Sequence, residues 1–426
     1  MTQDRNKSKS YSYYVFALLF LLYMFDYIDR LVVVSLFPYI KQDWGLTDAQ
    51  CGMLVSTVYW SILIFSLPAS ILVDRWSRKK SIGIMSVLWS MATMACAFSL
   101  NFKHLFAART AIGIGEAGYA AGGTAMISTL FPKENRARML GLWNASIPLG
   151  SALGIGLGGF IAAHFGWRNA FGIVAAPGLL VAILFFFVKD YKTVDLVYKQ
   201  DKKDKSTAVK MRFKDIVKHF AGNNTLIFNN IAFGASVFLT TGLMTWLPTY
   251  FHRTHGMSMT EAGTKTGIIM VLAIVGAPLG GYLADKWQKK RENGRPLFAA
   301  LTSFLTAIVL FFSFLFLKGN VQFAVLVLSG IIIVGFVPAS VAVTQDVVHP
   351  GLRAISLSLC VIIQHVLGSS TAPIVIGALS DSMGIESAMK FLPLAPVIAG
   401  VLFIITSVFY EDDLRRVEKS IGFESS

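Results

Sequence analysis

Charged residues are scarce in this sequence. Only 15% of its 426 residues are Asp, Glu, Lys or Arg, while 54% are hydrophobic. An ordinary soluble domain carries about 25% charged residues. Together with a mean hydropathy of +0.61 over the whole chain, this scarcity favours an all-α polytopic membrane protein over a soluble fold with one large core.

Several functional groups are also rare or absent. The three cysteines, Cys51, Cys96 and Cys360, are far apart in apolar runs, so we expect small apolar fillers rather than a disulfide or a metal site. His252 and His255 have no further ligand nearby and predict no metal site either. No G-x-x-x-x-G-K-[ST] stretch occurs, which argues against an ATP-driven pump. No nucleophile–base pair stands at membrane depth, so we expect no enzyme and no cofactor, with a proton gradient as energy source.

Long apolar runs divide the chain into two sets of six. They cover approximately residues 13–40, 49–73, 80–100, 104–131, 137–163 and 169–188, then 225–251, 260–284, 297–317, 321–345, 354–380 and 388–410. About 20 apolar residues span a membrane as a helix. We therefore predict twelve transmembrane helices, arranged as an N-terminal bundle (1–188), a basic linker (189–224), a C-terminal bundle (225–413) and a tail (414–426).

The linker 189–224 contains ten Lys or Arg. Near its end, apolar residues recur at helical spacing between basic ones: Phe213, Ile216, Val217 and Phe220. This pattern predicts a short helix on the membrane surface, with a plain flexible linker as the alternative.

The positive charges predict the orientation. With the N-terminus inside, the expected cytoplasmic segments carry 29 Lys or Arg and the outward loops carry 6. This asymmetry predicts that both termini are cytoplasmic. Anionic lipid headgroups then suffice as partners for the net charge of +14, without nucleic acid. The polar start followed directly by an apolar run predicts an uncleaved first span rather than a signal peptide.

An internal repeat supports the two-bundle division. "SILVDRWSRKK" (70–80) follows the second expected helix, and "GYLADKWQKKR" (281–291) follows the eighth. Such repeats predict two pseudo-symmetric halves that rock about a central site. We expect the loop residues to stabilise one conformational state, with a pure topology signal as the alternative. These loop residues are Asp74, Arg75, Arg78, Asp285 and Lys286.

Ionisable residues inside the membrane are expensive and indicate function. "FDYIDR" places Asp26, Asp29 and Arg30 at i, i+3 and i+4 of the first helix. Arg109 and Glu116, seven residues apart, lie on one face of the fourth. Both groups fall near the middle of the bilayer, so we expect Asp29, Arg30 and Glu116 to cluster in one cavity.

A cavity that changes the exposure of such a carboxylate could load and release a proton. We predict that Asp29 or Glu116, tuned by Arg30, couples transport to protons; the alternative is a static salt bridge between two helices. The expected substrate cavity draws on both halves: Asp26, Arg30, Arg109, Tyr119, Thr241, Trp246, Gln364 and His365. For His365, a hydrogen bond between helices is an equal alternative.

The stretch "RTAIGIGEAGYAAGG" spells G-x-G-x-x-G at Gly113, Gly115 and Gly118. A dinucleotide site needs a strand before that motif and a helix after it. Here the motif lies inside one long apolar run. We therefore predict one continuous helix whose small residues permit close packing against neighbouring helices.

The chain resembles the major facilitator superfamily in "DRWSRKK" and its echo "DKWQKK". Within it, "DYIDR", "IGIGEAGY", "LFPKENRARMLGLWNASIPLGSALG" and "TTGLMTWLPTYF" are most similar to spinster-like transporters, and sugar-acid symporters are near neighbours. By residue match, the spinster-like coupling residues fall on Asp29, Arg30 and Glu116. Asp26 departs from the pattern, because an Asn is more usual there, and Ser70 replaces the usual Gly of the first loop.

The resemblance implies alternating access, proton coupling and an amphipathic or anionic substrate. Animal spinster members handle lysolipids and sphingolipids, so a lysophospholipid-like solute is favoured. A small sugar acid or organic anion, or passive facilitation by the same fold, stays open. We expect a monomer in a bacterial inner membrane.

Overall fold

The structure is a computed structural model that describes residues 3–189, 220, 222–349 and 352–424, and every regular element in these ranges is a helix. The first half contains α1 (Gln3–Leu31), the 3₁₀ helix η1 (Val32–Leu36), α2 (Phe37–Trp44), α3 (Asp48–Arg75), α4 (Arg78–Cys96), α5 (Phe102–Glu116), α6 (Tyr119–Leu130), α7 (Lys133–Asn144), α8 (Ser146–Phe165) and α9 (Trp167–Phe185).

The second half contains α11 (Asn224–His255), α12 (Met259–Val271), α13 (Ala273–Gln288), α14 (Gly294–Phe316), α15 (Gly319–Ile333), α16 (Phe336–Asp346), α17 (Arg353–Gln364), the π-helical turn η3 (His365–Ser369), α18 (Ala372–Met383), α19 (Ile385–Phe391) and α20 (Leu394–Glu424). The all-helical architecture expected from the sequence is confirmed.

Helices occupy all twelve expected ranges. Among the described residues, nine helical segments are long and apolar enough to cross a membrane by length and composition. The other three expected spans, 13–40, 80–100 and 104–131, contain the buried charges or many Ser, Thr and Gly residues. These polar and small residues lower their hydropathy, so the crossing of all twelve stays a prediction.

The structure bears on the expected domain boundaries at residue 413 and in the linker. The tail continues the helix of the last span, because α20 runs from Leu394 to Glu424 without a break at 413. In the linker, Phe213, Ile216 and Val217 lie outside the described residues. Phe220 is described, and it is buried in an apolar cluster with Leu226 and Val347 of the second half.

Short polar side chains fix where several helices begin. The Thr47 hydroxyl accepts from the Gln50 N–H at 3.1 Å, and the Gln50 side chain accepts from the Thr47 N–H at 2.9 Å, closing a capping box on α3. Asn101 and Asn223 cap α5 and α11 through N–H groups three residues on. These bonds satisfy N–H groups that a helix leaves unpaired at its start.

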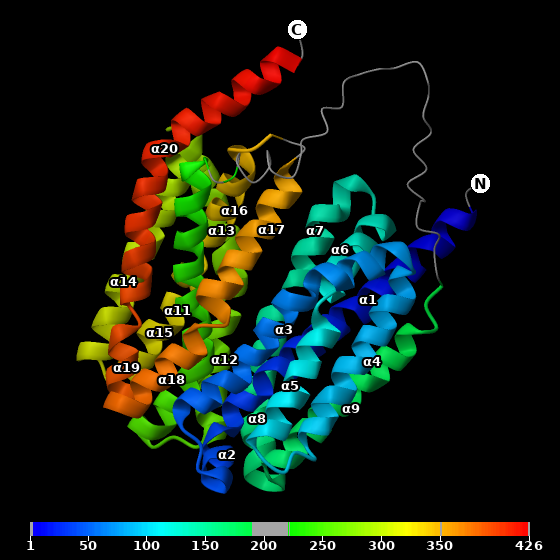
Figure 1. Cartoon of the computed structure of the whole chain (residues 1–426), viewed down its shortest axis with the longest axis vertical. Coiled ribbons are helices and arrows are strands. Elements are labelled where there is room, and N and C mark those ends of the chain that lie inside the picture. Colours follow the sequence, from blue (N-terminus) through cyan, green and yellow to red (C-terminus); the bar gives the residue numbers. More distant parts are fainter. Residues whose placement is uncertain (1–2, 190–219, 221, 350–351, 425–426) are drawn as a thin grey trace.

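The two halves form bundles that lie side by side, α1–α9 in one and α11–α20 in the other (Figure 1). They pack together where α8 meets α12 and α3 meets α18, toward the end opposite the chain termini. Glycines allow backbone contact there. A Cβ on Gly52 would lie 2.2 Å from the Pro373 carbonyl oxygen, and one on Gly159 would lie 2.6 Å from that of Met259.

A carboxylate joins the halves at this end. Asp48, with its side chain 2% exposed, accepts from Arg253 Nη1 and Nη2 at 2.6 and 2.8 Å and from the Ser380 hydroxyl at 2.6 Å. Lys41 donates to the same carboxylate. Asp381 accepts from the first two N–H groups of α3 at 2.7 and 2.9 Å. We call Asp48, Arg253, Ser380 and Asp381 the inter-half latch.

We predict that Arg253→Gln separates the halves at the latch. It removes two hydrogen bonds to a buried carboxylate, each contributing about 1.5–3 kcal/mol, so the population of separated molecules should rise at least about tenfold. Spin labels on the exposed positions Gln42 and Ser382 would report this as a longer inter-label distance.

Arg168→Gln is the matched control. Arg168 also pairs with an aspartate at this end, Asp43 at 2.9 Å, but within one half and with both side chains more than 40% exposed. The distance distribution should not change in this variant. An unaltered distribution in Arg253→Gln would show that the latch does not hold the halves together.

Candidate functional site

One arginine holds two carboxylates between α1 and α5. Arg30 Nη2 lies 3.0 Å from Asp26 Oδ2 and 2.9 Å from Glu116 Oε2. Asp26 and Arg30 are one turn apart on α1, and all three side chains are at most 7% exposed. A cation in such a setting is stable only when paired and hydrogen-bonded. The ion pair between Arg30 and Glu116 therefore fixes how α1 lies against α5.

Two tyrosine rings of the first half flank this arginine. The guanidinium carbon lies 4.5 Å from the centre of the Tyr27 ring and 5.4 Å from that of Tyr59, distances suited to cation–π attraction. The ring of His365, from the second half, lies 5.8 Å from the Tyr59 ring. The charged cluster thus reaches the second half through Tyr59.

Asp29 does not join the Arg30 pair, contrary to the expected trio. Residues 29 and 30 are neighbours on a helix and so point about 100° apart, which turns Asp29 toward α4. It is fully buried, and neither carboxylate oxygen has a hydrogen-bond partner among the described residues. Thr93 on α4 faces this carboxylate, but its hydroxyl donates to the Trp89 carbonyl oxygen at 3.0 Å.

The helix that carries Glu116 is interrupted directly after it. The single helix predicted over 104–131 is wrong in this respect, since α5 ends at Glu116 and α6 begins at Tyr119. Close packing at the small residues is confirmed. A Cβ on Gly115 would lie 2.8 Å from the backbone nitrogen of Trp89, and one on Gly118 would lie 2.8 Å from Met85 Cε. Glycines therefore let this segment approach α4 closely enough to bury Glu116.

Three predicted cavity residues make structural bonds instead. Arg109 is fully buried and donates only to backbone carbonyls. Tyr119 is 1% exposed and donates to the Leu19 carbonyl at 2.6 Å. Trp246 is fully buried and donates to the Pro373 carbonyl at 3.0 Å. In these three cases a bulky polar side chain within a span donates to a backbone carbonyl group of a neighbouring helix. The spacing of residues in the sequence does not reveal such a bond.

The other second-half candidates lie on α11 and around η3. Thr241 is 6% exposed, whereas its neighbour Thr240 lines the cavity described below. Gln364 is half-buried and donates to Cys360 Sγ at 3.2 Å. His365 opens the π-helical turn, and the hydroxyl of Ser370 donates to its carbonyl oxygen at 2.5 Å. π-helical turns inside helices recur at functional sites.

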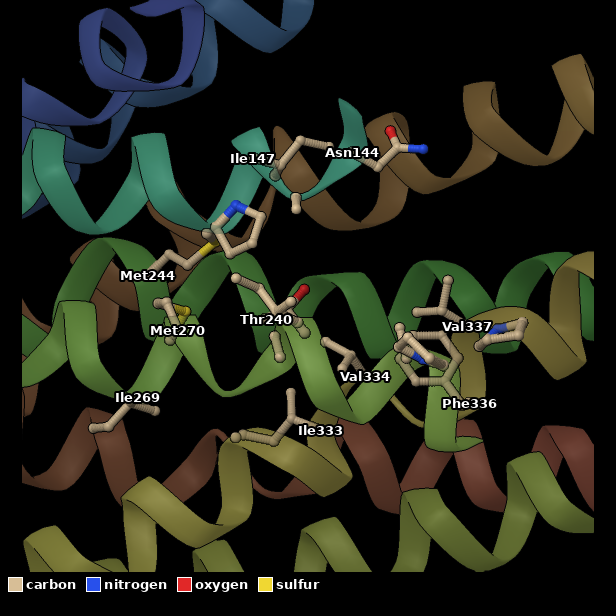
Figure 2. Close-up of a pocket in the computed structure, with 18 of the residues that line it drawn as sticks. Asn144, Ile147, Thr240, Met244, Ile269, Met270, Ile333, Val334, Phe336 and Val337 are labelled. Atoms are coloured by element: carbon tan, nitrogen blue, oxygen red, sulfur yellow. The ribbon is translucent and has the colours of Figure 1, made fainter. Parts of the chain in front are cut away.

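A cavity of about 730 Å³ lies between the two halves. Figure 2 shows Asn144 and Ile147 of the first half on one side, with Thr240 and Met244 of α11 below them. The rest of its wall is apolar and includes Met270, Ala277, Val334, Phe336 and Val337. Apart from the neighbourhood of Thr240, the sequence does not distinguish these lining residues, because apolar residues in a span face lipid as readily as a cavity.

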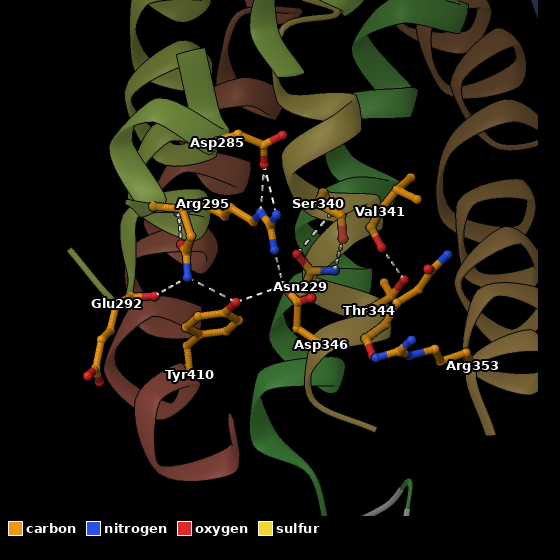
Figure 3. Close-up of polar contacts among 12 residues, drawn as sticks. Asn229, Asp285, Glu292, Arg295, Ser340, Val341, Thr344, Asp346, Arg353 and Tyr410 are labelled. Atoms are coloured by element: carbon orange, nitrogen blue, oxygen red, sulfur yellow. Dashed lines mark hydrogen bonds and ion pairs between the residues drawn. The ribbon is translucent and has the colours of Figure 1, made fainter. Parts of the chain in front are cut away.

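The second-half loop residue Asp285 belongs to an ion-pair network (Figure 3). Arg295 donates to Asp285 Oδ1 at 2.8 Å and to Asp346 Oδ2 at 2.6 Å, and the Tyr410 hydroxyl donates to Asp346 at 2.7 Å. Lys286 is exposed. In the first half, Arg78 begins α4, and the side chains of Asp74 and Arg75 lie outside the described residues.

A family model described as Major Facilitator Superfamily matches residues 19–373. The chain belongs to this superfamily of polytopic membrane transporters. It is 27% identical to protein spinster homolog 1 of Xenopus laevis over 94% of this chain and 81% of that protein. It is 28% identical to the hexuronate transporter of Bacillus subtilis (strain 168) over 69% of each chain.

Among solved structures, a bacterial homologue of the human lysosomal transporter Spinster, in an inward-facing and unoccupied conformation, superposes with a TM-score of 0.78. The two chains are 23% identical, and the match covers 96% of this chain and 98% of the other. The expected resemblance to spinster-like transporters, with a sugar-acid transporter as neighbour, is confirmed, and so is the superfamily fold.

We predict that Arg295→Gln destabilises this transporter. Arg295 is 24% exposed and bridges three helices through two aspartates, so its loss should lower the free energy of unfolding by about 1–3 kcal/mol. Arg415→Gln is the control, because Arg415 and Glu292 form a pair at 3.2 Å with both side chains about 60% exposed. Such surface pairs contribute about 0–1 kcal/mol. Thermal unfolding in detergent measures both, and equal shifts would contradict the assignment.

Proposed function

We propose that this superfamily member is a proton-coupled secondary transporter that moves an amphipathic solute by alternating access. The cavity of about 730 Å³ carries the proposal, since its wall comes from both halves and is almost wholly apolar. Ligand pockets of this size, mostly apolar with a few polar groups, suit organic molecules of moderate size. Rocking of the halves would expose such a cavity to each side in turn.

In this proposal, the positive charges of the loops determine how the protein is oriented in the membrane. With both termini cytoplasmic, the latch lies at the outer face and the molecule is in an inward-facing arrangement, as is stated for the superposed Spinster homologue. We place the protein in a bacterial inner membrane as a monomer, with anionic headgroups along its basic cytoplasmic face.

The proton site in this proposal is Glu116 or Asp29. Glu116 shares the Arg30 guanidinium with Asp26, so a proton on one carboxylate leaves the arginine paired with the other. Asp29 is buried, and neither of its carboxylate oxygens has a hydrogen-bond partner among the described residues, so its charged form lacks a direct partner there. A proton gained or lost at Glu116 changes whether Arg30 holds α1 and α5 together, and this would link the proton to the conformation.

An amphiphile fits the site better than a small anion. Arg109 uses its N–H groups on backbone carbonyls, and Arg30 already faces two carboxylates. An incoming anion would therefore compete with two negative side chains. The second candidate is a sugar acid or organic anion, which the 28% identity to a hexuronate transporter favours. Passive facilitation is the third.

We predict that at least one of the variants Glu116→Gln and Asp29→Asn reduces uptake driven by a pH gradient into proteoliposomes to the level of protein-free liposomes. Neither amide side chain can carry the proton. Transport of substrate down its own concentration gradient should persist. Uptake of a lysophosphatidylcholine and of glucuronate, each with proton flux, is the measurement. Unchanged proton-coupled uptake in both variants would remove the coupling hypothesis, and accumulation that never depends on pH would support passive facilitation.

Asp43→Asn is the control for this experiment. Asp43 is an exposed carboxylate outside the spans, and hydrogen bonds from Trp167 and Arg168 lower its pKa. It therefore stays ionised through the pH range of such a gradient. Its amide variant should accumulate substrate as the parent protein does.

We predict that Ala277→Phe blocks the amphiphile. A phenyl ring at this cavity position would fill space that an acyl chain requires, so binding of a lysophosphatidylcholine should weaken by more than about tenfold. Leu305→Phe, on the exposed face of α14, is the control. Binding measured by thermal shift against both ligands separates the candidates: loss for the lipid supports the amphiphile, and binding of glucuronate alone supports the sugar acid.

A further inference from the structure

The cavity between the halves contains very few polar side chains. Of the described residues that line it, only Asn144 and Thr240 carry a nitrogen or oxygen atom in the side chain, and neither is charged. A phosphate without a cation, or an ammonium group without a carboxylate, would lose hydration there without compensation. This wall therefore suits the uncharged part of an amphiphile and not its charged headgroup.

The two polar side chains occupy different places. Asn144 is the last residue of α7 and is exposed, whereas Thr240 lies in the interior of α11 and is half-buried. Figure 2 shows them on different sides of the cavity. Thr240 is therefore the polar group that a molecule inside the cavity meets, while Asn144 stands at its margin.

The Thr240 hydroxyl already uses its proton. It donates to the Val237 carbonyl oxygen, one turn earlier on α11, at 3.1 Å. A hydroxyl carries one proton and two lone pairs. Once the proton is bound to the backbone carbonyl, the oxygen can only accept further hydrogen bonds. At this point the wall can therefore bind a hydrogen-bond donor of the substrate but not an acceptor.

Apolar side chains surround this hydroxyl. Val237, Leu243 and Met244 of the same helix line the cavity beside it. Inside such a wall, an acceptor that has lost water is stabilised only by a donor on the bound molecule. The flexible side chains of Met244 and Met270, which also line the cavity, adapt to chains of different shape. The cavity can therefore distinguish the presence of one donor better than the length of a chain.

We propose that Thr240 is a specificity-determining residue, which accepts a hydrogen bond from an uncharged hydroxyl group next to the apolar chain of the substrate. This inference rests on the proposed transport of an amphiphile and narrows it. It selects lipids with one chain and a free hydroxyl beside it, such as the glycerol 2-hydroxyl of a 1-acyl lysophospholipid. A diacyl lipid, in which that oxygen is esterified, has no proton to donate and leaves Thr240 unpaired.

The test compares two ligands with the same chain and the same headgroup. One is a 1-acyl lysophosphatidylcholine, and the other is its analogue with hydrogen in place of the 2-hydroxyl. Dissociation constants are measured on the purified protein in nanodiscs, below the concentration at which either ligand forms micelles. The parent protein should bind the hydroxyl ligand about fivefold more tightly, as expected for one neutral hydrogen bond. Equal binding of the two ligands would overturn the proposal.

Thr240→Val removes the acceptor at nearly constant size, so the preference for the hydroxyl ligand should disappear. Thr240→Ser keeps the acceptor and should keep the preference. Thr264→Val is the matched control, since the Thr264 hydroxyl also donates within its own helix, to the Thr260 carbonyl oxygen at 2.8 Å, but lines a separate groove on α12. A preference that survives Thr240→Val, or one that Thr264→Val abolishes equally, would contradict the assignment.

Asn144→Ala distinguishes the two polar side chains of the cavity. Because Asn144 stands at the margin, its loss should leave the preference for the hydroxyl ligand unchanged. Loss of the preference in this variant, with the preference of Thr240→Val intact, would assign the hydroxyl to Asn144 and refute the role of Thr240.

The same measurements separate this inference from the proposed function. If the parent protein binds both ligands equally, the amphiphile proposal stands and only the role of Thr240 is lost. If it binds neither ligand, the proposed transport of an amphiphile is wrong, and the role of Thr240 is lost with it.

Discussion

The attraction between one guanidinium and two carboxylates, inside a low-dielectric bundle, constrains the whole first half. Arg30 cannot remain buried unless Asp26 stands one turn before it and Glu116 meets it from another helix. That requirement fixes the rotation of α1, the end of α5 and the glycines that let α5 approach its neighbours. The two tyrosine rings enclose the same cation.

Sequence established the architecture because membrane physics leaves few alternatives. Apolar runs of spanning length and the repeated Asp–basic–Trp loops are direct consequences of helical packing in lipid, and Arg30 and Glu116 were found because charges at membrane depth are rare. The sequence could not show that Asp29 turns away from this pair. Nor could it show that Arg109, Tyr119 and Trp246 donate to backbone, because both outcomes use the same residue types. The apolar cavity could not be predicted from the sequence, because side chains that face lipid and side chains that line such a cavity are of the same types.

The two halves share a backbone interruption but use it differently. In the fourth expected span, α5 (Phe102–Glu116) and α6 are separated by two residues; in the tenth, its repeat equivalent, α15 (Gly319–Ile333) and α16 are separated likewise. Each first segment has 15 residues, and a glycine, Gly118 or Gly335, stands in each gap. At the first gap lies Glu116 with its ion pair. At the second lie Val334 and Phe336, which line the cavity.

The Arg30 ion pairs and the apolar cavity lie in different places, and α8 connects them. A Cβ on Gly150 would lie 2.3 Å from the Met24 carbonyl oxygen and 2.9 Å from Tyr27 Cβ, so α8 lies directly on the helix that carries Arg30. Two residues earlier, Pro148 lines the cavity. A rotation of α1 that follows from breaking or making the Arg30 pairs cannot leave α8 in place, because the backbones are already in contact. In the proposed proton-coupled cycle, the shape of the uncharged cavity would therefore depend on the protonation of Glu116.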